Sequence, residues 1–162
     1  MKSFFKQPHL LAAGIWIFTI ALIGGLLTEI GPWYMSLKQP GWKPPDWSFG
    51  VIWTIIFIFS GVAWNIAWLS SNQRKEKIIL SILFLLNGIL NVLWSFLFFK
   101  LHRPDLSLIE AIFLWLSVFF IILNTASYAR KASVLMLPYL IWVSIAMLLN
   151  WQIIQMNSAF IS

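Results

Sequence analysis

Long apolar runs, separated by shorter polar segments, dominate the chain. Five of them approach or exceed the roughly 20 residues that a helix needs to cross the hydrocarbon core of a bilayer. Glu110 is the only charged residue inside any run. The pattern predicts an all-α membrane protein built as a bundle of five transmembrane helices. The runs cover residues 10–27, 49–70, 78–99, 106–126 and 134–156.

With one exception, the links between the runs are short. Residues 71–77, 100–105 and 127–133 each join two successive runs. Links of this length connect antiparallel neighbours in helical bundles. We therefore expect a single membrane domain, residues 1–162, folded as an up-and-down bundle.

Lys and Arg are unevenly shared between the two ends of such a bundle. Seven lie in the N-terminal segment and in links 71–77 and 127–133, against four in the other two links. Because basic residues favour the cytoplasmic side, this distribution predicts a cytoplasmic N-terminus.

The exceptional link, residues 28–48, contains four Pro together with Trp33, Tyr34, Trp42 and Trp47. One interpretation is an aromatic belt at the membrane interface. The other is a structured first loop that acts as a lid over the mouth of the bundle. Proline stiffens the segment, its aromatic rings need burial, and unstructured links of this length are uncommon. These features favour the lid.

Polar and aromatic residues recur at helical spacing in four of the runs. Polar side chains are costly in a bilayer and usually face the bundle interior, and residues three or four apart share one helix face. The resulting amide-lined and aromatic faces suit a pocket for a flat, mostly apolar ligand. Alternatively, each Asn forms hydrogen bonds between helices, the commoner role for an individual residue. The four faces comprise Phe49, Trp53, Phe57, Gly61 and Asn65; Asn87, Asn91 and Ser95; Glu110, Ser117 and Asn124; and Tyr139, Trp142, Ala146 and Asn150.

Composition narrows the class of protein further. The chain is 60% hydrophobic and only 10% charged, whereas a soluble domain is about 25% charged. Its 11 Lys and Arg are divided among the segments between and before the apolar runs rather than gathered on one groove, so we expect no nucleic-acid binding. The chain has no Cys, and His9 and His102 flank different helices at opposite ends, which predicts no metal site. The sequence shows no carboxylate pair, nucleophile–base pair or Gly-rich phosphate loop of the kind that catalysis uses. We expect no cofactor. Four cations near the predicted lid are available to anionic groups: Lys38, Lys43, Lys100 and Arg103.

Four motifs carry a resemblance to a known family. The most specific, residues 33–53, has the core Trp42-x-Pro44-Pro45-x-Trp47 and ends at Trp53. The others are Leu90-Asn91-x-x-Trp94-Ser95, then Glu110 followed by Leu114-Trp115, and finally Leu137-Pro138-Tyr139-Leu140-x-Trp142. Over nearly its whole length the chain resembles the TspO/MBR family, which includes bacterial tryptophan-rich sensory proteins and the mitochondrial translocator protein, or peripheral-type benzodiazepine receptor.

The resemblance implies a five-helix bundle, usually a homodimer, with a ligand pocket under the first loop. It implies porphyrins such as protoporphyrin IX, and isoquinoline or benzodiazepine-type drugs, as ligands. Tyr34 and Trp94 enter the predicted site through the resemblance alone. The predicted ligand-binding residues are Tyr34, Trp42, Trp47, Trp53, Phe57, Asn87, Asn91, Trp94, Trp142 and Ala146.

Two departures from the family pattern affect these expectations. Gln39 separates Lys38 from Pro40, which moves one charge by one position. Asn150 is followed by Trp151 where a sterol-type motif has Tyr, and no basic residue follows. The second departure puts sterol binding in doubt.

Three functional hypotheses follow. The first is a tetrapyrrole-binding protein that senses, stores or carries its ligand. The second is light- and oxygen-dependent porphyrin degradation, in which Trp53 and Trp142 would be the catalytic residues. The third is a small secondary transporter, although no inverted repeat is evident. The absence of an evident transit peptide and the resemblance to bacterial members predict a bacterial cytoplasmic membrane.

Overall fold

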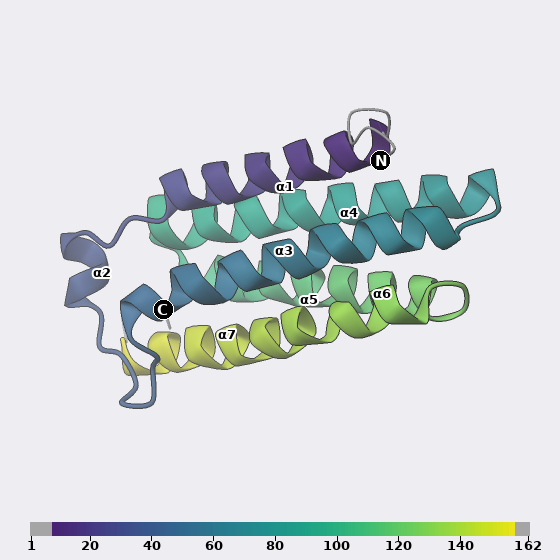
Figure 1. Ribbon diagram of the computed structural model, residues 1–162. Coiled ribbons are helices and arrows are strands. Elements are labelled where there is room, and N and C mark those ends of the chain that lie inside the picture. The colour runs from purple at the N-terminus through teal and green to yellow at the C-terminus, as the bar shows by residue number, and fades with distance from the viewer. Residues whose placement is uncertain (1–7, 158–162) are drawn as a thin grey trace.

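The computed structural model describes residues 8–157, and its long elements are all helices (Figure 1). Five helical spans are long and apolar enough to cross a membrane, as the apolar runs predict. No strand occurs between residues 8 and 157. The long helices are α1 (Pro8–Leu27), α3 (Asp46–Ser70), α4 (Arg74–Ser95), α5 (Pro104–Ala126) and α7 (Leu137–Met156); the short ones are α2 (Pro32–Ser36) and α6 (Arg130–Leu135), and a π-helical turn, η2, covers Phe96–Lys100.

Several helices extend beyond the apolar runs. The third span begins at Arg74, and α6 with α7 extends the fifth back to Arg130. An apolar run marks the hydrocarbon layer, whereas the backbone gains from internal hydrogen bonding in the headgroup region as well. At the start of α4, Gln73 and Glu76 form a capping box. The chain reaches α7 through a break at Met136, next to Pro138.

The end of α4 widens into η2, a feature that the sequence pattern did not predict. The Leu101 N–H donates to Phe96 O at 3.0 Å, a bond of π-helical spacing. The wider turn allows two consecutive side chains, Phe98 and Phe99, to be buried together, with 2% and 9% of their surface exposed. His102 then adopts φ 52°, the left-handed region that non-glycine residues seldom occupy.

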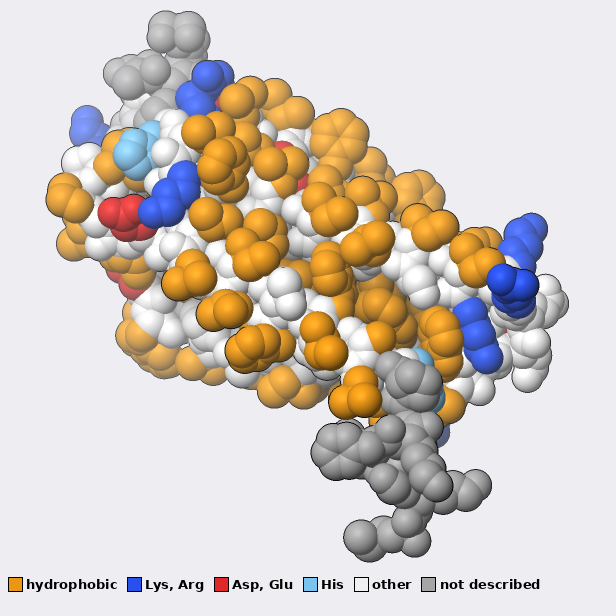
Figure 2. Space-filling view, turned by 90° about the horizontal axis from the view of Figure 1, so that it is seen from above, with side chains coloured by type: hydrophobic (Ala, Val, Ile, Leu, Met, Phe, Trp, Pro, Cys, Tyr) orange, Lys and Arg blue, Asp and Glu red, His pale blue; other side chains and the backbone are white. Residues whose placement is uncertain are grey.

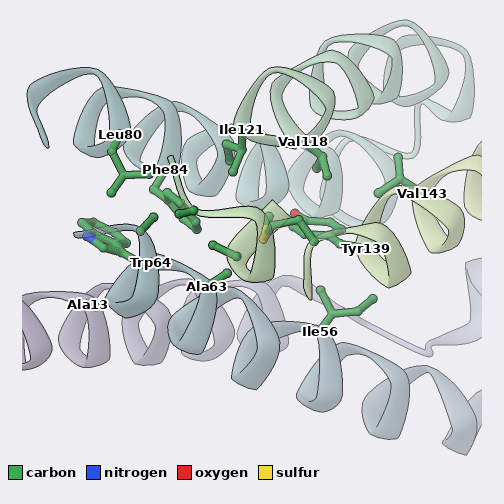
Figure 3. Packing of buried hydrophobic residues seen from close by; sticks show 14 of the residues in the cluster. Ala13, Ile56, Ala63, Trp64, Leu80, Phe84, Val118, Ile121, Tyr139 and Val143 are labelled. Carbon is green, nitrogen blue, oxygen red and sulfur yellow. The ribbon is translucent and has the colours of Figure 1, made fainter. Parts of the chain in front are cut away.

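The core of the bundle lies between α3, α4, α5, α6 and α7 (Figure 3), with α3 packed mainly against α6. Ala63 and Ala67 are 1% and 0% exposed, and such small side chains allow helices to approach closely in membranes. On the outer side α1 packs along α4, where a Cβ atom on Gly88 would overlap side-chain atoms of Trp16 and Ile20. Large apolar side chains cover the flanks of the molecule (Figure 2), as a lipid-facing surface requires.

Amide side chains link α4, α5 and α7 to one another by hydrogen bonds. Asn87 Nδ2 donates to Ser117 Oγ at 2.8 Å and joins α4 to α5. Asn91 Nδ2 donates to Tyr139 OH at 3.0 Å and joins α4 to α7. In addition, α7 is joined to α5, where Asn150 Nδ2 donates to Ser107 Oγ at 2.9 Å. Asn87, Asn91 and Asn150 therefore each form a hydrogen bond between helices, the alternative role considered for an individual Asn. Asn124, expected on an inner face, is half-buried and accepts a hydrogen bond from Tyr128.

Candidate functional site

The long first link is folded against one end of the bundle. Its helix α2 buries Tyr34, and the residue that follows α2, Leu37, is also buried. The two belong to one apolar cluster with Phe98, Phe99 and Leu149. Trp33 stacks on His102 with ring centroids 4.1 Å apart. Tyr34 is thus buried on the bundle end and Trp33 is half-buried there, whereas Trp42 and Trp47 remain 44% and 74% exposed. We call residues 28–45, the part of the link that precedes α3, the lid.

Hydrogen bonds fix the lid to the end of α7. Trp42 Nε1 donates to Gln152 Oε1 at 2.6 Å. The backbone of Lys38 makes two bonds with the Asn157 amide: its N–H donates to Oδ1 at 3.0 Å, and its carbonyl accepts from Nδ2 at 3.0 Å. These bonds hold the two halves of the sequence together at the mouth of the bundle.

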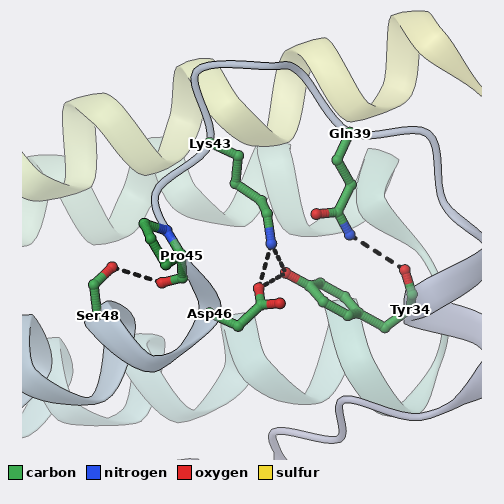
Figure 4. A network of polar contacts seen from close by, with 6 residues as sticks. All are labelled: Tyr34, Gln39, Lys43, Pro45, Asp46 and Ser48. Atoms are coloured by element: carbon green, nitrogen blue, oxygen red, sulfur yellow. Dashed lines mark hydrogen bonds and ion pairs between the residues drawn. The ribbon is translucent and has the colours of Figure 1, made fainter.

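A polar network ties the lid to the start of α3 (Figure 4). Tyr34 OH donates to Asp46 Oδ1 at 2.9 Å, and Lys43 Nζ donates to Tyr34 OH at 3.2 Å and forms an ion pair with Asp46. Burial raises the pKa of the Tyr34 hydroxyl. Burial also acts to lower the pKa of Lys43, but the hydrogen bonds to Asp46 and Tyr34 outweigh it and the pKa is raised. At neutral pH the network therefore holds a neutral phenol between opposite charges.

Beneath the lid lies a cavity of about 490 Å³. Helices α1, α3, α4, α5 and α7 all contribute to its walls, and Tyr34 contributes from the lid. Its size falls in the usual range for a site that encloses an organic ligand. Among the lining residues are Tyr34, Trp47, Phe49, Trp53, Phe57, Asn91, Trp94, Phe98, Phe99, Leu114, Trp142, Ala146 and Asn150.

Aromatic contacts hold the rings of the cavity wall in place. Trp53 stacks on Phe57 at 5.4 Å and meets the edge of Tyr139 at 5.7 Å. Trp142 lies edge-on to Phe49 at 5.5 Å. Centroid distances of this size are typical of favourable aromatic pairs. These contacts set the orientation of the Trp53 and Trp142 rings in the cavity wall.

Two buried polar atoms in lining residues have no hydrogen-bond partner within residues 8–157. They are Trp142 Nε1, a donor, and Asn150 Oδ1, an acceptor. Buried polar atoms are normally paired. Both of these atoms have essentially no accessible surface, so a ligand in the cavity would reach them only if neighbouring side chains moved. The other amide in the wall, Asn91, already donates to Tyr139.

Most of the cations expected to serve anionic groups at the mouth are already paired. Lys43 pairs with Asp46, Lys100 Nζ lies 2.7 Å from Glu29 Oε2, and Arg103 Nη2 lies 2.5 Å from Asp105 Oδ2. The hydrogen bond from Lys100 lowers the pKa of Glu29. Lys38 alone of the four forms no ion pair with another described residue. The mouth is therefore close to neutral rather than strongly basic.

Comparison with known proteins identifies the family. The sequence profile of the TspO/MBR family matches residues 12–156. The chain belongs to the TspO/MBR family. It is 35% identical to the tryptophan-rich protein TspO of Chlorobaculum tepidum over 153 residues, which cover 87% of this chain and 97% of that protein. The corresponding protein of Archaeoglobus fulgidus is 32% identical over 151 residues, with 92% and 97% covered. The translocator protein of Bos taurus is 27% identical over 126 residues, with 77% and 75% covered.

In this TspO/MBR protein, eight of the ten predicted ligand-binding residues line one cavity: Tyr34, Trp47, Trp53, Phe57, Asn91, Trp94, Trp142 and Ala146. The structure places the other two elsewhere. Trp42 lies on the lid, 44% exposed, and donates to Gln152. Asn87 is buried one helical turn below Asn91 and is bonded to Ser117.

Sequence reasoning also missed part of the cavity wall. Ala21, Gly24 and Gly25 of α1 line it, although α1 has no polar or aromatic stripe. The only signal in the sequence was the pair of adjacent glycines, whose missing side chains leave open space: an added Cβ at either position would meet no atom within 4 Å. Phe98 and Phe99 line it too, through a π-helical turn that apolar periodicity does not reveal.

Proposed function

We propose that this TspO/MBR protein binds a tetrapyrrole of the protoporphyrin IX type in the cavity beneath the lid. The observation that carries the proposal is the wall itself. Indoles from three helices, Trp53 of α3, Trp94 of α4 and Trp142 of α7, line one cavity. A flat macrocycle can bury both of its faces against such rings.

Stacking rather than charge is the main source of affinity in this proposal. An aromatic pair is worth about 0.5–1.5 kcal/mol beyond the area that it buries. The cations near the mouth are mostly neutralised by carboxylates, so propionate groups would compete with Asp46 for Lys43. We therefore expect the affinity to depend only weakly on salt concentration, because screening acts chiefly on exposed charges.

The lining residues of the cavity are mostly apolar and aromatic, so the wall suits a flat, mostly apolar molecule. Isoquinoline and benzodiazepine-type drugs are flat and mostly apolar, so we expect them to compete for the same cavity.

The test is a titration of the detergent-purified protein with protoporphyrin IX in the dark, followed by Trp fluorescence and the Soret band. We expect saturable binding, weakened about tenfold by Trp53→Ala or Trp142→Ala, the equivalent of about 1.4 kcal/mol. Trp151→Ala is the matched control, because Trp151 is 46% exposed and lies outside the cavity wall. Unchanged affinity in both cavity variants would refute the proposed site.

Porphyrin degradation is the second candidate, and one observation favours it. Trp53 and Trp142, the two oxidisable indoles named for this role, line the same cavity, so a bound porphyrin would contact both. Illumination of the complex in air tests it. A new absorbing species that forms with wild type but not with Trp142→Phe would support degradation. Retained binding with no product would leave a binding protein only.

A further inference from the structure

The two ends of the bundle differ in how their charges are paired. The ion pairs within residues 8–157 all lie at the lid end. At the opposite end Arg74, Lys75, Lys77, Arg130 and Lys131 have no carboxylate partner among the described residues. Figure 2 shows red side chains beside blue ones at the lid end and a cluster of blue ones at the other.

The acid at this basic end does not neutralise the cluster. Glu76 Oε2 accepts from Ser71 Oγ at 2.9 Å and from the Gln73 N–H at 3.4 Å. These bonds cap α4 and keep the carboxylate turned toward the link before the helix. The neighbouring cations are therefore free to attract an anion from outside the protein.

Two of these cations lie beside a surface hollow of about 390 Å³ at the start of α4. Arg74, Lys77 and Ser81 follow one another at helical spacing on α4, so they lie on one face. Ile78 and Ile82 continue that face and are 50% and 57% exposed. The hollow is thus basic at the helix start and apolar along the next two turns. The end of α3 contributes its remaining lining residue, Trp68.

Trp68 shapes the basic part of the hollow. Lys77 Nζ lies 5.5 Å from the centroid of the Trp68 ring, and His9 of α1 stacks on the same ring at 5.9 Å. A cation over an indole face is attracted to it and keeps its N–H groups for an anionic acceptor. Trp is also enriched at the headgroup level of membranes, the depth at which α4 begins.

We propose that this hollow binds an anionic phospholipid from the leaflet at the Arg74 end. The phosphate would lie between Arg74 and Lys77, and one acyl chain would run along Ile78 and Ile82 toward the bilayer centre. Charge complementarity selects an anionic headgroup, and the exposed isoleucines select a lipid over a soluble phosphate. Basic hollows beside transmembrane helices suit such headgroups. The site lies at the end opposite the lid cavity and does not depend on the function proposed there.

The expected contribution of the two cations is large enough to measure. A basic residue near an anionic membrane surface is worth about 1 kcal/mol, which corresponds to about fivefold in affinity at 25 °C. Removal of both should therefore weaken binding of the anionic lipid about 30-fold. A zwitterionic lipid should lose far less, because it carries no net charge.

The experiment measures lipid adducts of the full-length protein by native mass spectrometry in a neutral detergent. Phosphatidylglycerol is titrated against phosphatidylcholine with wild type, with Arg74→Gln/Lys77→Gln and with Arg130→Gln/Lys131→Gln. The last variant is the matched control, because it removes two charges at the same end but outside the hollow. Glycerol phosphate, which has no acyl chain, is added as a soluble competitor.

We expect wild type to prefer phosphatidylglycerol, the hollow variant to lose that preference, and the control variant to keep it. Equal loss in the control variant would overturn the proposal, because attraction would then belong to the whole basic end. Equal binding of the two lipids would overturn it as well. Competition by glycerol phosphate at lipid-like concentrations would show a soluble anion site instead. Protoporphyrin IX titration of the hollow variant reports separately on the lid cavity.

Discussion

The contact of α1 with α4 allows a quantitative prediction for Gly88→Ala. A Cβ atom there would overlap the Trp16 ring and the Cδ1 atom of Ile20. Neither side chain can move freely, because Trp16 Nε1 donates to Phe84 O at 3.2 Å and Ile20 is only 6% exposed. The added methyl group must therefore displace α1 or force these side chains out of their preferred rotamers.

Two opposing terms set the magnitude. Ala is favoured over Gly within a helix by about 1 kcal/mol, whereas overpacking a well-packed contact costs about 1–3 kcal/mol. We expect Gly88→Ala to lower the free energy of unfolding by about 1 kcal/mol. Gly14→Ala is the matched control, because its Cβ would meet no atom within 4 Å. That change should be neutral or stabilising by up to about 1 kcal/mol.

The assay is reversible unfolding in mixed micelles, followed by circular dichroism. Ile20→Val removes Cδ1 and leaves the rest of the side chain, so Gly88→Ala should be less costly in the Ile20→Val background. Such coupling between contacting residues is about 0.5 kcal/mol or more. Because Ala21 and Gly24 line the cavity one turn further along α1, Gly88→Ala should also weaken porphyrin binding. The reasoning fails if Gly88→Ala is as stable as Gly14→Ala.

Two further predictions concern the lid and the orientation. Tyr34→Phe should cost about 1 kcal/mol, because Asp46 loses a hydrogen bond but keeps Lys43. Since burial raises the pKa of Tyr34, the folded state holds that proton more tightly than the unfolded state, and wild type should lose stability as the pH rises above about 10. Thermal unfolding across that range should show a smaller loss in Tyr34→Phe, and an equal loss would contradict this assignment. The chain has no Cys, so a single introduced cysteine reports the orientation directly. In intact cells an impermeant maleimide should label Leu101→Cys and not Asn72→Cys. The reverse labelling would contradict the cytoplasmic N-terminus that the distribution of Lys and Arg predicts.

The spans followed from the sequence because the bilayer imposes both a length and full internal hydrogen bonding on each segment. Which residues line the cavity followed less completely, because it depends on how helices sit against one another. Asn87 and Asn91 share a face of α4, yet Ser117 of α5 bonds to the first, while the second lies in the cavity wall. Both Asn form a hydrogen bond to another helix, and which of them also reaches the cavity depends on how α4 sits against its neighbours, which periodicity within one helix does not contain.

Charge pairing was equally hidden from the sequence pattern. Lys100 and Glu29 are 71 positions apart, and only the folded lid end brings them to 2.7 Å. Lys43 and Asp46 are near in sequence and pair directly, and only the folded lid brings Tyr34 of α2 to bond with both. A count of basic residues near the mouth therefore overestimated the charge available to a ligand.

The interhelical hydrogen bonds divide the cavity wall into two parts with different support. Side-chain amides join α4, α5 and α7 pairwise, and Trp115 Nε1 adds a bond to Ser144 Oγ between α5 and α7. Among the described residues, α3 makes no side-chain hydrogen bond to these three helices, and α1 makes one, from Trp16. The half of the wall with Asn91, Trp142 and Asn150 is thus held by hydrogen bonds between helices. The half with Trp53 and Gly24 depends on apolar packing. A packing change such as Gly88→Ala should therefore alter the second half while leaving the first in place.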